Sequence, residues 1–161
     1  MVPPVDERQL RYAFGCFPSG VTAVCAFIDG SPVGMAASSF TSVSLDPPLV
    51  SVCVQRTSTT WQKLVCSPRL GISFLGIDHD VACQQLAAKT GDRFAGVDWQ
   101  ADPGGAVFLD GASVWLDCQL DQRISAGDHE IALLRIERLR VESDVSPLVF
   151  HGSRFRQLAS P

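Results

Sequence analysis

The sequence contains little positive charge and almost no lysine. Of its 13 basic residues only Lys63 and Lys89 are lysines, and the formal net charge is −4 with an isoelectric point near 5.2. A surface that binds nucleic acid or an anionic membrane needs clustered cations. The composition therefore argues against nucleic-acid and membrane partners. The arginines that remain suit planar contacts with phosphate or carboxylate groups, or simple solvation.

Long hydrophobic segments are also missing. The longest apolar run, residues 21–28, is far too short to span a bilayer as a helix, and the N-terminus lacks the pattern of a secretory signal. We therefore expect a soluble, cytoplasmic protein. The 161 residues, 46% hydrophobic and 19% charged, fit a single domain over residues 1–161. Within it we expect residues 1–9 to be flexible.

Paired cysteines and the common catalytic fingerprints do not occur. The six cysteines are scattered without a Cys-x-x-Cys pair, so we interpret most of them as small buried hydrophobic residues. Residues 78–80 and 128–130 each place a histidine between two acidic residues, but neighbours on a strand point to opposite faces, and we predict no metal site. There is no glycine-rich dinucleotide fingerprint, P-loop or nucleophile elbow. Hydrolase function therefore has little support.

What the sequence does contain is mainly strand pattern. Apolar or alternating segments predict strands at residues 20–28, 32–40, 49–55, 69–76, 112–122 and 129–142. Asp29-Gly30 predicts a hairpin turn between the first two. On the last strand, Leu139 and Val141 keep the facing of Ile136 only if a β-bulge lies near Arg138. Short strands at close spacing favour an antiparallel barrel, which also removes exposed strand edges.

Two short helices are predicted between the strands. One of the hydroxyl residues 57–59 can cap a helix that carries Trp61 and Leu64 on one side and stops before Pro68. A second helix is expected from a capping Asp78 to just before Gly91. It is followed by a loop-rich stretch up to residue 105, and long connections of this kind are often functional.

Hydroxyl side chains crowd the segment that leads into the third strand. Ser38, Ser39, Thr41, Ser42 and Ser44 fall on both faces of any strand, so a polar outer face does not explain them. Turn chemistry, in which hydroxyls bond nearby backbone where two strands meet, is one explanation. A polar ligand held against the segment is the other, and the residues alone leave the choice open.

Five segments, in order along the chain, resemble the flavin reductase family, the small reductase components of two-component flavin-dependent monooxygenases. They are FPSGVTAV (17–24), GMAASSFTSVSLDPPLVSVCV (34–54), DRFAGVDW (92–99), GDHEI (127–131) and PLVFHGSRFRQL (147–158). The resemblance extends over nearly the whole chain. It implies a mainly β fold, an antiparallel Greek-key split β-barrel of the FMN-binding type with two short inserted helices, usually as a homodimer.

The resemblance implies an NAD(P)H:flavin oxidoreductase, which passes hydride from NADH or NADPH to FMN or FAD and supplies reduced flavin to a partner monooxygenase. In relatives, the segment matching residues 38–44 runs along the isoalloxazine ring, and the one matching 55–60 lies near the ribityl phosphate. Fixed donors beside the ring stabilise the reduced anion. A helix start with Arg56 beside it suits a phosphate.

The resemblance also assigns individual residues. His129 matches a histidine on the nicotinamide side, and we predict that it is the catalytic residue. We expect it to orient the nicotinamide, because hydride transfer needs no general base. The predicted cofactor-binding residues are Thr22, Ala37, Ser38, Ser39, Phe40, Thr41, Ser42, Gln55, Arg56, Ser58, Thr59, Thr60, Lys89, Phe94 and Phe155.

Several of these assignments have alternatives. Phe94 and Phe155 can each cover a planar ligand or belong to the core. Relatives often carry Lys before the loop Phe and Tyr at the C-terminal aromatic position, so Arg93 and Phe155 depart from the family pattern. Lys89 is also what a helix C-terminus favours. Two other functions stay open: a module that holds flavin tightly without reducing free flavin, and an interaction domain that binds no flavin.

Overall fold

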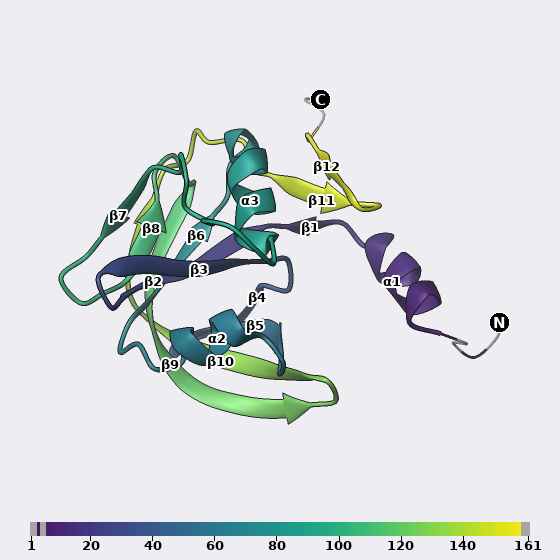
Figure 1. Ribbon diagram of the computed structural model, residues 1–161, viewed down its shortest axis with the longest axis horizontal. Coiled ribbons are helices and arrows are strands. Elements are labelled where there is room, and N and C mark those ends of the chain that lie inside the picture. The colour runs from purple at the N-terminus through teal and green to yellow at the C-terminus, as the bar shows by residue number, and fades with distance from the viewer. Residues whose placement is uncertain (1–2, 4–5, 159–161) are drawn as a thin grey trace.

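A computed structural model describes residue 3 and residues 6–158 of the chain (Figure 1). Its main element is a seven-stranded antiparallel sheet with the strand order β3-β2-β6-β9-β10-β5-β4. The strands of this sheet are β2 (Thr22–Ile28), β3 (Ser31–Ala37), β4 (Thr41–Leu45), β5 (Pro48–Gln55), β6 (Leu70–Phe74), β9 (Val114–Ala126) and β10 (His129–Val141).

Two small sheets and four helical segments complete the described chain. One small sheet has the order β1-β11-β12, and the other pairs β7 with β8. These strands are β1 (Ser19–Gly20), β7 (Trp99–Ala101), β8 (Val107–Leu109), β11 (Val149–His151) and β12 (Arg154–Arg156). The helical segments are α1 (Glu7–Gly15), α2 (Thr59–Leu64), the 3-10 turn η1 (Ile77–His79) and α3 (Asp80–Ala87).

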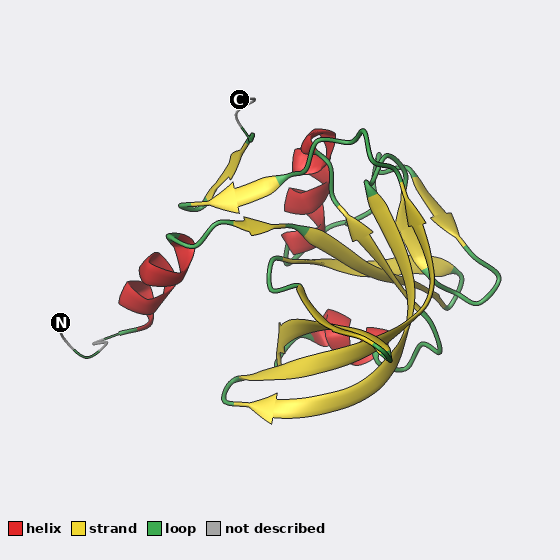
Figure 2. Cartoon of the chain, turned by 180° about the vertical axis from the view of Figure 1, so that it is seen from behind, coloured by secondary structure: helices red, strands yellow, loops and turns green. Residues whose placement is uncertain are grey.

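The large sheet curves without closing into a barrel. Its end strands, β3 and β4, are joined by residues 38–40, and within the described residues they do not pair with each other. Strands β6, β9 and β10 follow one another across the sheet, and β5, which precedes β6 in the chain, lies beside β10, which makes a Greek key. Figure 2 shows how strongly the long strands bend. The predicted mainly β, antiparallel split barrel is therefore confirmed.

The apolar run at residues 21–28 is explained by burial on both faces of β2. Val24 belongs to a core that includes Trp61 of α2, whereas its neighbour Cys25 belongs to a second core that includes Leu86 of α3. Side chains alternate between the two faces of a strand, so a strand between two cores has no polar face. The two helices therefore cover different cores.

The predicted turn and bulge are both present. Asp29 and Gly30 have φ of 51° and 81°, and the pair of positive values is what a type I′ hairpin turn requires. The pairing of β10 with β9 shifts register between Ile136 and Arg138, as the pattern predicted, and again between Leu133 and Leu134. Beyond the shift between Ile136 and Arg138, Leu139 is paired with the buried Leu116. Leu139 therefore lies on the same face of the sheet as Leu116, although its own side chain is 64% exposed.

The hydroxyl-rich segment is organised differently from the prediction. A single strand over residues 32–40 is wrong, because β3 ends at Ala37 and a separate strand β4 begins at Thr41. The pairing of β4 with β5 also shifts register between Ser42 and Ser44. A strand break and a bulge lie within eight residues, and each one changes which side chains point to a given face of the sheet. This explains why the hydroxyl residues occupy both odd and even positions in the sequence.

The predictions for the two helices and the long loop are only partly correct. The prediction of a cap in residues 57–59 is confirmed, because Ser58 Oγ accepts a hydrogen bond from Trp61 N at the start of α2. Asp78, however, lies inside η1 and does not cap α3. The stretch up to residue 105 is not all loop, since β7 pairs with β8.

The N-terminal region adds a helix that the sequence analysis did not predict. Helix α1 is capped by Asp6, whose side chain accepts from Gln9 N at 2.9 Å, and it has no buried residue. Both views show it projecting away from the sheets (Figures 1 and 2). The expected flexibility of residues 1–9 falls partly on residues outside the described chain and stays a prediction.

All six cysteines are free, and three of them, Cys25, Cys83 and Cys118, are buried. The interpretation of most cysteines as buried is therefore wrong for the other three, which are exposed. Within the described residues, no group of three or more His, Cys, Asp or Glu side chains is arranged to hold a metal ion. In the same part of the chain, no helix combines the length and the apolar character needed to cross a bilayer.

Candidate functional site

Two adjacent pockets lie where the hydroxyl-rich segment meets the small sheet β1-β11-β12. One has a volume of about 550 Å³ and the other of about 540 Å³, and they share Val21 and Ser38 in their walls. Both fall within the range of small-molecule sites, roughly 300–1,000 Å³. Together they form one continuous concave region beside the small sheet.

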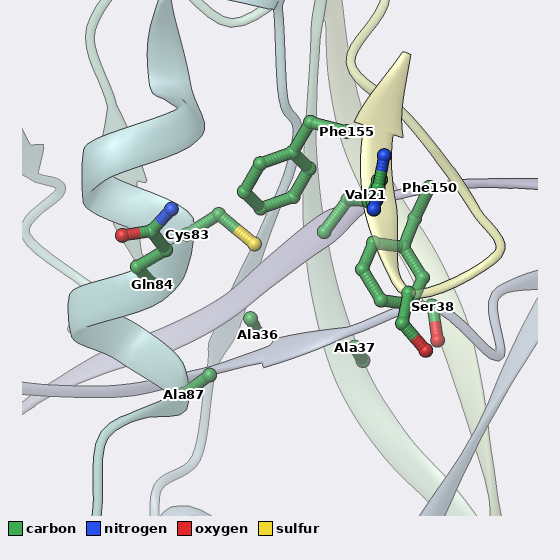
Figure 3. A pocket seen from close by; sticks show the side chains of 11 residues that line it. Val21, Ala36, Ala37, Ser38, Cys83, Gln84, Ala87, Phe150 and Phe155 are labelled. Carbon is green, nitrogen blue, oxygen red and sulfur yellow. The ribbon is translucent and has the colours of Figure 1, made fainter. Parts of the chain in front are cut away.

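The first pocket lies between α3 and the hairpin β11–β12 (Figure 3). The rings of Phe150 and Phe155 extend into it from the hairpin, with their centroids 5.8 Å apart and their planes inclined at 62°, and Cys83 faces them from α3. Ala36 and Ala37 contribute small side chains from β3. Burial raises the pKa of the Cys83 thiol to about 11, so at neutral pH it is an apolar wall residue and not a thiolate nucleophile.

The second pocket is lined by the segment from Phe17 to Thr22 and by residues 38–41. Phe40 packs edge-on against Phe74 at 4.7 Å, which holds the link between β3 and β4 against the sheet. Phe17 is 77% exposed although it lines this pocket. The wall is therefore a mixture of hydroxyls, backbone and aromatic edges.

The predicted hydroxyl residues in these pockets divide into two kinds. Thr22 and Ser39 are occupied by the fold: Thr22 Oγ1 donates to Ala37 O at 2.9 Å, and Ser39 Oγ accepts from Cys53 N and donates to Cys53 O. Ser38 and Thr41 are exposed, and in the described part of the chain their hydroxyls have no partner. Turn chemistry thus explains part of the hydroxyl cluster, and Ser38 and Thr41 are left for a ligand.

A second group of predicted residues lies around the turn between β9 and β10. Arg56 N donates to Asp128 O at 3.1 Å, which brings residues 55–60 against the Gly-Asp-His turn. His129 is paired with Gln55 across β10 and β5, so their side chains share one face of the sheet. Thr41 is paired with Ser51, which has the same parity as Gln55, so Thr41 faces that side as well.

The ring of His129 is held by its neighbour. Its Nδ1–H donates to Asp128 Oδ1 at 2.8 Å, and this hydrogen bond lowers the pKa of Asp128. In the neutral ring the other nitrogen, Nε2, is then unprotonated and can accept a hydrogen bond. The imidazole is 39% exposed.

Three predicted residues do not join either group as expected. Phe94 is only 8% exposed, lies in the second core and lines neither pocket, which favours its core alternative. Lys89 is exposed beyond the end of α3 and is absent from both pocket walls. The hydroxyl of Ser58 is used by the helix cap. Their contacts with a cofactor stay predictions.

Other residues that line the first pocket were not predicted from the sequence, above all Phe150, Arg154 and Gln84. A signal was available for the hairpin. Gly152 and Ser153 have φ of 59° and 58° between two aromatic residues, and Gly-Ser between short apolar segments is a two-residue turn pattern. The position of α3 opposite the hairpin had no comparable local signal.

Comparison with known proteins decides the family. The sequence matches the flavin reductase like domain over residues 14–159. The chain belongs to the flavin reductase family. It is 37% identical over 157 residues to a flavin reductase of Pseudomonas putida, covering 97% of this chain and 92% of that protein. It is 34% identical over 151 residues to the reductase subunit of a flavin-dependent monooxygenase of Rhodococcus jostii, covering 94% and 77%.

Solved flavin reductases have the same fold. The NADH:FAD oxidoreductase of Streptomyces globisporus, in complex with NAD and FAD fragments, has a TM-score of 0.92 and 38% identity, covering 99% of this chain and 96% of that one. The flavin reductase component of a bacterial two-component tryptophan halogenase has a TM-score of 0.88 and 34% identity, covering 97% and 100%.

The two departures of this flavin reductase from the family pattern have visible consequences. Arg93 Nη1 donates to Thr60 Oγ1 and to Gly34 O, both at 3.0 Å, so it ties the long loop to α2 and to β3. Its guanidinium is thereby engaged within the protein. Phe155 brings a ring without a hydroxyl into the first pocket, which makes that wall apolar where a tyrosine would add a donor.

Proposed function

We propose that this protein is an NADH-dependent flavin reductase that supplies reduced flavin to a partner monooxygenase. The observation that carries the proposal is the match, over nearly the whole chain, to reductases and monooxygenase reductase subunits whose names state this activity. FAD is the flavin we favour, because one relative is named an NADH-dependent FAD reductase at 38% identity over 165 residues. FMN and NADPH are the alternatives to compare.

The pockets fit a flavin. The isoalloxazine ring is planar and apolar with a polar edge, and the two pockets combine Phe150, Phe155 and small aliphatic residues with the unpartnered hydroxyls of Ser38 and Thr41. A flavin held there would supply N5 as the hydride acceptor. Ser38 and Thr41 would donate hydrogen bonds to the polar edge, where negative charge develops on reduction.

His129 would act on the nicotinamide as an acceptor. With Nδ1–H bound to Asp128, its Nε2 is available to a carboxamide N–H, which fixes the orientation of the nicotinamide ring. No proton has to be removed for hydride transfer, so the role we assign to His129 is orientation. Thr59 and Arg56 remain the groups that we propose for the flavin phosphate.

We also propose a homodimer in the cytoplasm. The chain exposes 9852 Å², whereas a compact monomer of 17.3 kDa exposes about 7,800 Å². A second copy would cover part of this excess, to which the projecting α1 contributes. Six free cysteines suit a reducing compartment, and NADH is used there.

The first test is NADH oxidation in air, followed by absorbance with substoichiometric FAD, then FMN, against a blank without protein. We expect many NADH equivalents to be oxidised per flavin, faster with FAD. No oxidation with either flavin, and none with NADPH, would overturn the proposal. Dialysis distinguishes the tight-binding module, since that alternative requires the flavin colour to stay with the protein.

A further inference from the structure

A buried carboxylate lies directly behind the predicted nicotinamide residue. Glu130 is 7% exposed and accepts hydrogen bonds from two side chains. Arg123 binds it with two N–H groups, Nε to Oε1 at 2.7 Å and Nη2 to Oε2 at 2.8 Å, and the indole N–H of Trp61 also donates to Oε1. Trp61 is fully buried in α2, so this carboxylate joins α2 to the hairpin β9–β10.

The register places Glu130 on the opposite face from His129. Glu130 is paired with Val54, which is 2% exposed in the core beneath α2. His129 is paired with Gln55 on the other face. The backbone of β10 is thus held from the α2 side at the residue that follows His129.

A charged group is a costly way to fill this position. Glu130 is buried although its partner Arg123 is 40% exposed, and burying a carboxylate costs desolvation free energy that an apolar residue does not, so stability alone does not account for Glu130. A bidentate pair, in contrast, constrains distance and angle. The three donors fix Glu130 relative to Trp61, and Trp61 directly follows Thr60 in the segment that meets the Gly-Asp-His turn.

We propose that Glu130, held by Arg123 and Trp61, is a positioning residue for hydride transfer. It fixes the start of β10, and with it His129, relative to α2 and residues 55–60. The inference rests on the proposed role of His129 toward the nicotinamide. It predicts an effect on nicotinamide use that is larger than any effect on flavin binding.

The test compares Glu130→Gln with Asp117→Asn. Asp117 is the matched control, because it is a buried carboxylate on the same hairpin that also binds arginines, Arg69 and Arg138, but it is paired with Gly71 of β6 and is not adjacent to His129. We expect Glu130→Gln to raise the KM for NADH about tenfold and to leave the Kd for FAD, measured by fluorescence quenching, within twofold. Asp117→Asn should lower Tm and leave both values within twofold.

A second variant covers the possibility that Glu130→Gln does not fold. Arg123 is 40% exposed, so Arg123→Gln should fold, and we expect it to raise the KM for NADH about threefold. The inference is overturned if these variants lower Tm but leave the KM for NADH unchanged. It is also overturned if Asp117→Asn raises the KM for NADH by the same factor. Wild-type protein that oxidises no NADH would instead overturn the proposed function, and this inference with it.

Discussion

The hairpin β9–β10 carries a buried carboxylate toward each of its ends, and the two ends differ in what surrounds it. At the far end, Asp117 is paired with Gly71 of β6, and β9 has a strand on both sides. At the turn end, Glu130 is next to His129, and its strand β10 lies between β9 and β5. Both carboxylates accept hydrogen bonds from arginine.

Burial and ion pairing by themselves do not identify a functional carboxylate. Arg69 and Arg138 bind Asp117 at 2.8 and 2.7 Å, distances equal to those around Glu130. What differs is the neighbourhood. Glu130 adjoins residues that the family resemblance assigns to cofactors, whereas Asp117 joins β9 to the chain before β6 and to β10. Substitutions at the far end should therefore change stability, and those at the turn end should change catalysis.

The largest effect is expected from Gly71→Ala at the far end. An added Cβ would lie 2.1 Å from the carbonyl oxygen of Val107, a backbone atom that cannot move aside without displacing β8. We expect a loss of about 3 kcal/mol or more in the free energy of unfolding. The corresponding fall in Tm is about 6–12 °C, measured by circular dichroism on melting.

Gly15→Ala is the control for this prediction. An added Cβ at Gly15 meets no atom within 4 Å, so its effect should stay within about 0.5 kcal/mol. Equal melting temperatures for Gly71→Ala and the wild type would show that β6 and β8 are less closely packed than described.

Lowering the pH should reduce the stability that Asp117 and Glu130 each contribute to the folded protein. Burial alone would raise the pKa of Asp117, but hydrogen bonds from Arg69 and Arg138 outweigh it and the pKa is lowered. The hydrogen bonds from Arg123 lower the pKa of Glu130, against the effect of burial. A carboxyl with a lowered pKa in the folded state adds stability above its unfolded pKa of about 4, and this is lost as pH falls through the folded pKa.

Urea denaturation at a series of pH values from 6 to 3 measures this loss. The double variant Asp117→Asn, Glu130→Gln should be less stable than the wild type at pH 6, with a smaller further loss on acidification. Each single variant should remove part of the dependence of the free energy of unfolding on pH. Parallel curves for the wild type and the double variant would contradict the lowered pKa values.

Much of the fold followed from local pattern, and the misses have physical causes. The Asp29-Gly30 turn and the bulge near Arg138 are encoded by neighbouring residues, so the sequence predicted them correctly. The break at Ala37 was hidden, because the residues on both sides of it favour strands and tertiary pairing decides where one ends. The pairing of β7 with β8 was hidden because the loop-rich stretch up to residue 105 has no clear strand pattern, and β7 is defined by its pairing with β8.

At the turn end, His129→Ala should change catalysis without changing the fold. Its side chain is 39% exposed and contacts Asp128, which is itself exposed, so little packing is lost. We expect the KM for NADH to rise about tenfold, equivalent to about 1.4 kcal/mol, with Tm and FAD affinity little changed. Initial rates over a range of NADH concentrations measure this. An equal loss of NADH and FAD affinity would contradict the division of roles.

The candidate site was predicted less completely than the fold. Resemblance supplied Ser38, Thr41, Phe155 and His129, but a hydroxyl's partner depends on contacts that sequence does not give. Ser39, for example, binds the backbone of Cys53, fourteen residues along the chain, which no local rule predicts. Arg154 and the wall formed by α3 were missed because they depend on how the hairpin β11–β12 packs.

The smallest effects separate two neighbouring hydroxyls at the start of α2. Ser58 Oγ accepts from Trp61 N at 3.1 Å, so Ser58→Ala should cost about 1 kcal/mol of stability through loss of the helix cap. Thr59 is exposed and its hydroxyl has no partner among the described residues, so Thr59→Ala should leave Tm unchanged. If residues 55–60 hold the flavin phosphate, Thr59→Ala should weaken FMN binding several-fold and leave riboflavin binding unchanged, measured by fluorescence titration. Equal affinities of this variant and the wild type for FMN would show that the flavin phosphate does not contact the Thr59 hydroxyl. The Ser58 effect on melting would still stand, because it depends only on the cap.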